Sequence, residues 1–155
     1  MTTAALYDWL LLGHIVAAMV WVGGGVLVAA MAVTAIRGGD PAAVARLVGS
    51  LRVLGPAVLA PATISVLGSG IWLVLDSDAW AFDQGWVQLA IGLFAVAFIV
   101  GAAHQSRAAL RAERAAAAGD DAEARHQLVR WTWGYALVVV ALVVVAWDMV
   151  FKPGL

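Results

Sequence analysis

Four long apolar segments dominate this sequence and limit what it can fold into. A helix needs about 20 apolar residues to cross a hydrocarbon core of roughly 30 Å. In lipid, a helix satisfies its backbone hydrogen bonds internally. The sequence therefore predicts an all-α fold, an up-down transmembrane four-helix bundle. The segments run from Trp9 to Ile36, from Val53 to Leu75, from Trp86 to Ala103 and from Trp131 to Phe151.

Charged residues are scarce in this chain. They make up 12% of its 155 residues, whereas hydrophobic residues make up 64%. A soluble domain usually has about 25% charged residues, so most of this surface is expected to face the bilayer. The net charge of −1 argues against a nucleic-acid partner. The length fits one domain, residues 1–155.

The basic residues predict how the chain is oriented in the membrane. Eight of the nine lie in the first and third connections between the apolar segments, and the charged residues of the second connection are all acidic. By the positive-inside rule, connections one and three are cytoplasmic, and both termini lie outside a multi-pass plasma-membrane protein. The arginines are Arg37, Arg46, Arg52, Arg107, Arg111, Arg114, Arg125 and Arg130.

Both basic connections are expected to contain helices at the cytoplasmic surface. Asp40 is a good helix N-cap and Pro41 a good first helical residue, so a short helix on the membrane surface is predicted up to Arg52. The third connection should extend the third span into water, break at residues 119–121 and restart towards Arg130.

His14 is a polar residue within the first apolar segment, where polar groups are costly. At 100° per residue it shares one helix face with Trp21 and Gly25, which suits a bundle interior or an interface. A neutral imidazole can bind haem iron or copper. It can equally hydrogen-bond a neighbouring helix as a packing contact. The residues leave both interpretations open, with His14, Trp21 and Gly25 as the candidate cofactor-binding residues.

Asp148 and Met149 lie near the outer end of the fourth segment, at about the depth of His14. A metal site, for example for copper, is therefore predicted from His14, Asp148 and Met149. The alternative is an ion pair between Asp148 and Lys152, which are four residues apart with the acid first.

The stretch from His14 to Gly24 has a histidine, then Trp21 seven residues later, then glycines. It resembles the first span of copper-resistance protein D-like membrane proteins and of the bacterial membrane protoporphyrinogen oxidase. Over nearly its whole length the chain more closely resembles a family of predicted integral membrane proteins without assigned function (domain-of-unknown-function family 2269). The further matching stretches are 7–10, 60–62, 70–75 and 148–153, together with Trp86.

The closer resemblance implies four spans and a membrane role. The oxidase resemblance implies that His14 is a haem ligand. We expect a non-enzymatic protein with an accessory or packing role, which forms a homo-oligomer through the Gly23–Gly25 face of its first span. The alternative is a redox-active haem b- or copper-binding module with His14 as ligand.

Overall fold

The computed structural model describes residues 3–153, and nearly all of them are helical. Four long helical rods are formed, each long and apolar enough to cross a membrane. This confirms the all-α, four-span prediction. The rods are α1 (Thr3–Gly38), then α2 (Pro41–Leu54), η1 (Gly55–Leu59) and α3 (Ala60–Leu75), then α4 (Gly85–Ile99), η2 (Val100–Gln105) and α5 (Ser106–Ala117), and finally α6 (Asp121–Phe151).

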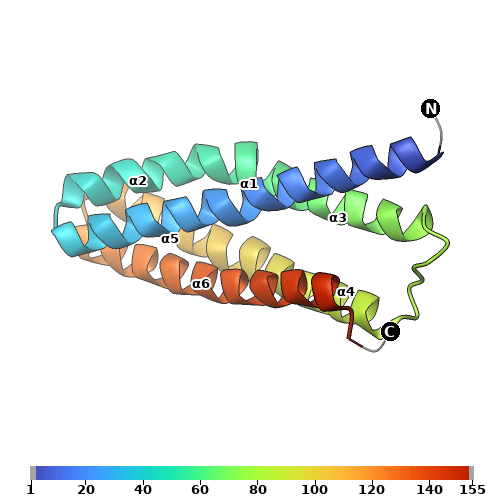
Figure 1. The fold of residues 1–155 in the computed structure, drawn as a ribbon. Coiled ribbons are helices and arrows are strands. Elements are labelled where there is room, and N and C mark those ends of the chain that lie inside the picture. The colour runs from blue at the N-terminus through green and yellow to red at the C-terminus, as the bar shows by residue number, and fades with distance from the viewer. Residues whose placement is uncertain (1–2, 154–155) are drawn as a thin grey trace.

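The rods lie side by side in two layers, which Figure 1 shows from the side. One layer holds α1 with the α2–α3 rod, and the other holds the α4–α5 rod with α6. α1 packs against α3 and α6, while α6 also packs against α4 and α5. The chain ends and the α3–α4 connection lie at one end of the bundle, as an up-down topology requires (Figure 1).

The helix predicted after Asp40 is present, but its direction differs from the expectation. The Asp40 side chain caps α2 by accepting a hydrogen bond from the Ala42 N–H at 2.9 Å, and Pro41 opens the helix. α2 then continues into α3 through the π-helical turn η1, which contains Pro56, and does not form a separate helix along the membrane surface. The reason is its apolar face, which is buried in the bundle. This face consists of Val44, Leu47, Val48 and Leu51.

The rods are longer than a bilayer requires. α1 has 36 residues and α6 has 31, which corresponds to about 54 and 46 Å at ~1.5 Å per residue. The exposed apolar side chains of α6 extend from Trp133 to Phe151, a rise of about 27 Å, close to the hydrocarbon thickness. The part of the bundle before Trp133 in α6 therefore projects beyond the hydrocarbon.

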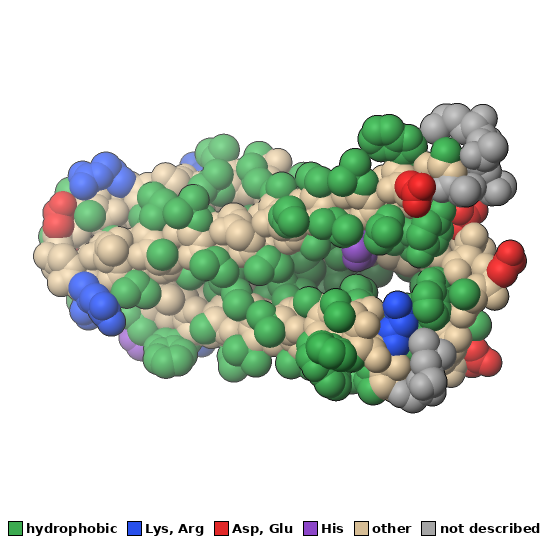
Figure 2. All heavy atoms as spheres, in the orientation of Figure 1, with side chains coloured by type: hydrophobic (Ala, Val, Ile, Leu, Met, Phe, Trp, Pro, Cys, Tyr) green, Lys and Arg blue, Asp and Glu red, His purple; other side chains and the backbone are tan. Residues whose placement is uncertain are grey.

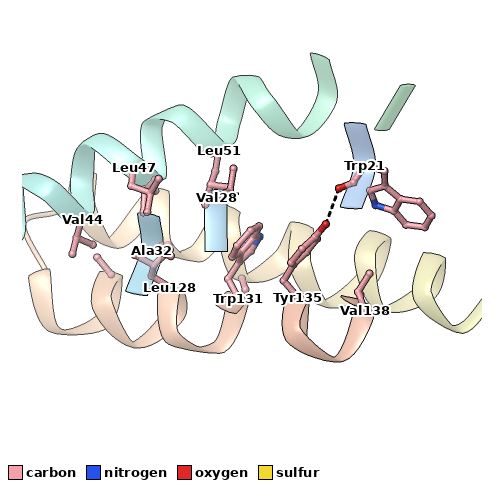
Figure 3. Close-up of a cluster of buried hydrophobic side chains, with 14 of the residues drawn as sticks. Trp21, Val28, Ala32, Val44, Leu47, Leu51, Leu128, Trp131, Tyr135 and Val138 are labelled. Atoms are coloured by element: carbon pink, nitrogen blue, oxygen red, sulfur yellow. Dashed lines mark hydrogen bonds between the residues drawn. The ribbon is translucent and has the colours of Figure 1, made fainter. Parts of the chain in front are cut away.

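This projecting part, which we call the α2/α5 end, comprises α2, α5, the last turns of α1 and the first turns of α6. Figure 3 shows apolar side chains from three of its helices pointing towards one another: Val28 and Ala32 of α1, Leu47 and Leu51 of α2, and Leu128 and Trp131 of α6. Small residues of α5 (Ala108, Ala112 and Ala115) complete this core. A substantial part of the buried core thus lies in the projecting end.

The opposite part, which we call the terminal end, carries both chain ends and the α3–α4 connection. Figure 2 shows the surface hollowed between the two layers here, with a histidine side chain at the edge of the hollow. His104 and His126 belong to the α2/α5 end, since His104 contacts the Arg130 carbonyl and His126 lies in the first turns of α6. The histidine at the hollow is therefore His14.

Candidate functional site

The His14 imidazole is half-buried and forms a hydrogen bond with α3 of the neighbouring rod. Its Nδ1 lies 3.0 Å from the hydroxyl oxygen of Ser69 in α3. The Ser69 hydroxyl donates its one proton to the carbonyl of Ser65 in the preceding turn. With its proton used in this way, Ser69 accepts a hydrogen bond from the imidazole, which favours the neutral tautomer with its proton on Nδ1. The other nitrogen, Nε2, keeps its lone pair.

Gly70 gives the imidazole room to approach α3. A Cβ atom at this position would lie 3.2 Å from His14 Cε1, closer than an ordinary van der Waals contact. Sequence reasoning found His14 but missed Ser69. The signal for Ser69 was its spacing, because Ser65 and Ser69 are four residues apart and thus share one face of an apolar helix.

Trp21 and Gly25 lie on the predicted inner face of α1, and both are buried. The Trp21 carbonyl accepts a hydrogen bond from the Tyr135 hydroxyl of α6 at 2.8 Å (Figure 3). The Tyr135 ring occupies the space that a Cβ atom at Gly25 would need. The Trp21 ring also meets Phe94 of α4 edge to face. These contacts join the two layers, and a cofactor role for Trp21 and Gly25 stays a prediction.

Asp148 is completely buried, with 0% of its surface exposed, and neither carboxyl oxygen has a hydrogen-bond partner. Its side chain therefore bonds neither to His14 nor to Lys152. The expected Asp148–Lys152 ion pair is not formed, because the Lys152 ammonium instead lies 4.4 Å from the ring centre of Trp80 and 5.6 Å from that of Trp86. Those rings come from the α3–α4 connection and the start of α4.

The predicted metal site of His14, Asp148 and Met149 also stays a prediction. Met149 is half-buried on α6, directly after Asp148. Within residues 3–153, no three His, Cys, Asp or Glu side chains gather closely enough to hold a metal ion. Any copper site here would need donors of another kind, such as thioether sulfur.

A second polar cluster lies where the bundle leaves the hydrocarbon. The Gln105 amide, oriented by its partners, donates to the Trp131 carbonyl at 2.9 Å and accepts from the Tyr135 N–H at 2.7 Å. His104 Nε2 lies 3.3 Å from the Arg130 carbonyl, and its ring packs where Gly134 has no side chain. These side chains fasten the π-helical turn η2 to α6, so His104 has a packing role distant from His14.

Residues 8–153 match the model of a family described as a predicted integral membrane protein, DUF2269. The chain belongs to this family. The protein is therefore an integral membrane protein, which confirms the bilayer as its environment. The likeness to copper-resistance protein D and to protoporphyrinogen oxidase stays a prediction, because the match concerns the DUF2269 family alone. No curated protein and no solved structure matches the chain.

Proposed function

We propose that this membrane protein binds haem b in the hollow of its terminal end, with His14 Nε2 as the iron ligand. The tautomer of His14 carries this proposal. Histidines that bind metals usually donate their other ring N–H to a fixed partner, which orients the ring and raises its basicity. The chain from His14 Nδ1 through Ser69 to the Ser65 carbonyl supplies such a partner inside the membrane.

The residues around His14 fit haem better than they fit a bare metal ion. Haem needs one axial donor and apolar walls, because the porphyrin supplies the other four nitrogens. The hollow lies between layers with mostly apolar side chains (Figure 2). A copper ion would need several protein donors, and no such cluster of His or carboxylate groups lies in the described residues.

Haem at this site would supply one-electron redox chemistry. The chain's own residues would hold the haem through His14: Ser69 orients His14, Gly70 leaves room for its ring, and the Trp21–Tyr135 contact joins the layers below the hollow.

The absorption spectrum of detergent-purified protein tests this proposal, together with metal analysis. The protein is expressed with added haem and copper and compared with His14→Ala. We expect a Soret band in the wild type that is lost in His14→Ala and retained in His104→Ala, the matched control at the other end. A colourless, metal-free wild type would refute the proposal.

A second candidate function is the non-enzymatic accessory or packing role. It is supported by the same His14–Ser69 hydrogen bond, which fastens α1 to α3 without any ligand. In this case the partner is a second copy bound through the Gly23–Gly25 face. Only part of that face is free, since Gly25 is buried against Tyr135, whereas Gly23 is exposed with open space around it. Loss of a dimer in Gly23→Leu, measured by light scattering in detergent, would support this role.

The proposed orientation in the plasma membrane has the α2/α5 end in the cytoplasm. The arginines of that end support it through the positive-inside rule. The chain has no cysteine, so single-cysteine variants give an unambiguous test. A cysteine at Gly119 should react with an impermeant maleimide only after the cells are lysed, and one at Ser77 should react in intact cells. The reverse pattern would overturn the orientation.

A further inference from the structure

Two arginines of the α2/α5 end lie where the hydrocarbon of the membrane ends. On α6, Trp133 is 72% exposed and is the last lipid-facing aromatic residue, and Arg130 follows one turn farther out. On the neighbouring rod, Arg107 is the first charged residue after the apolar stretch that begins at Trp86, a rise of about 31 Å. Both arginines are thus placed at the depth of the lipid headgroups.

Contacts between the rods confirm that the two arginines share one level. His104 of η2 touches the Arg130 carbonyl, and Gln105 bonds to the neighbouring Trp131 carbonyl. Arg107 comes two residues after Gln105, so it lies within one helical turn of the level of Arg130. The two guanidinium groups therefore belong to one region of the surface, formed by α5 and α6.

Neither arginine has an ion pair among the described residues, and both are exposed. The charge of Arg52, by contrast, is neutralised, because its guanidinium donates to Glu113 at 3.0 Å. Arg107 and Arg130 thus present unneutralised charge at the membrane boundary. Two further arginines, Arg111 and Arg114, continue the α5 stripe away from the membrane by about 6 and 10 Å.

We propose that Arg107 and Arg130, with Trp133 beside them, form a binding site for the phosphate of an anionic glycerophospholipid. A guanidinium group binds phosphate through paired hydrogen bonds. The Trp133 ring is exposed to lipid at the depth where indoles favour the interface, so it contacts the glycerol and upper acyl region. This combination of phosphate donors and a lipid-facing ring fits a headgroup attached to its acyl chains.

Lipid exchange in nanodiscs, read by native mass spectrometry, tests this site. The preference for phosphatidylglycerol over phosphatidylcholine is measured for wild type, for Arg107→Gln with Arg130→Gln, and for Arg37→Gln with Arg114→Gln. Both double variants remove the same charge from exposed positions at the same end. We expect the first to lose roughly tenfold or more of the preference, since each juxtamembrane arginine strengthens anionic-lipid binding several-fold, and the control to lose less than about twofold.

The alternatives each predict a different result. An equal loss in both double variants would show diffuse attraction by the whole basic end, and an unchanged preference in the first variant would show no site; either result overturns the proposal. Displacement of phosphatidylglycerol by inorganic phosphate at tens of millimolar would assign the site to free phosphate and would also overturn it. Circular dichroism melts of the variants establish that each is folded.

Discussion

The two ends of this bundle treat their polar groups and their interior space in opposite ways. At the α2/α5 end, Asp40 and Asp120 cap helices, Gln105 binds the α6 backbone, and core side chains such as Leu128 are fully buried. At the terminal end, Asp148 is buried without a partner and the layers part around His14. Gln127 is the exception at the α2/α5 end, because its Oε1 lacks a partner while its amide nitrogen binds Glu123.

The difference indicates that the α2/α5 end serves as the scaffold and that the terminal end contains the candidate site. A well-packed, polar-satisfied end holds the four rods in register without help from lipid. Unsatisfied groups and open space cost stability, and they are retained mostly where a ligand, a proton or a partner makes use of them. The contrast therefore supports the placement of the proposed ligand at His14.

The largest predicted effect tests the contrast in packing. Leu128 is 0% exposed in the core of the α2/α5 end, whereas Leu142, 14 residues closer to the terminal end of α6, is 9% exposed. We expect Leu128→Ala to lower the free energy of unfolding by about 3 kcal/mol and Leu142→Ala by about 1 kcal/mol, because lipid or solvent can fill the space left at the open end. Unfolding in detergent by denaturant titration measures both. Equal losses would show that the terminal end is packed as tightly as the other.

A second prediction concerns the contact at which the two ends meet. The Tyr135 ring fills the space beside Gly25, while Gly23 faces open space. Gly25→Ala should cost about 1–3 kcal/mol through overpacking, and Gly23→Ala should be neutral or slightly stabilising, because alanine is the better helix former. Thermal melts of both variants check this. If Gly25→Ala has the same melting temperature as the wild type, the Tyr135–Trp21 contact does not join the layers.

A third prediction concerns Asp148 at the terminal end. Replacing a buried carboxyl group that lacks partners by an apolar side chain of similar size should raise stability by about 1 kcal/mol, or roughly 2–4 °C in Tm. Asp148→Leu is compared with Asp148→Asn, which keeps the shape and remains polar, and only the leucine variant should gain. A clear loss of stability in both variants would mean that the carboxyl group has a bound partner in the membrane.

These features differ in how far the sequence could predict them. Apolar segment length predicted the four spans, and the 100° rotation per residue predicted the face shared by His14, Trp21 and Gly25. The residues that contact this face, Ser69 and Tyr135, could not be predicted. Which residues of the other rods reach the face depends on the register between the rods. This register depends on how side chains from separate rods interlock, and the hydrophobic pattern of one segment contains no information about it.

Local spacing also misled in two places. The four-residue separation of Asp148 and Lys152 favours an ion pair, but Trp80 and Trp86, distant in sequence, attract the ammonium group instead. Asp40 and Pro41 correctly predicted a helix start, yet they carry no information on the direction of α2. That direction follows from the burial of Leu47 and its neighbours against the other rods.

The smallest predicted effect tests how the α2/α5 end satisfies its polar groups. Both the Nε and an Nη atom of Arg125 donate to the Ile36 carbonyl in the last turn of α1, at 3.4 and 3.3 Å. Carbonyls in a last turn have no helical partner, so Arg125→Ala should cost about 0.5–1 kcal/mol. Arg37→Ala is the control, since it removes the same charge from the last turn of α1 itself and should cost less than about 0.5 kcal/mol.

Arg125→Lys separates the hydrogen bonds from the charge. A lysine keeps the favourable interaction of a cation with a helix C-terminus but loses the paired donors of the guanidinium group. If the lysine variant has the same melting temperature as the alanine variant, hydrogen bonding to the Ile36 carbonyl is what stabilises this end. If it has the same melting temperature as the wild type, the charge alone is sufficient. The two ends then differ in their packing and not in how well their polar groups are hydrogen-bonded.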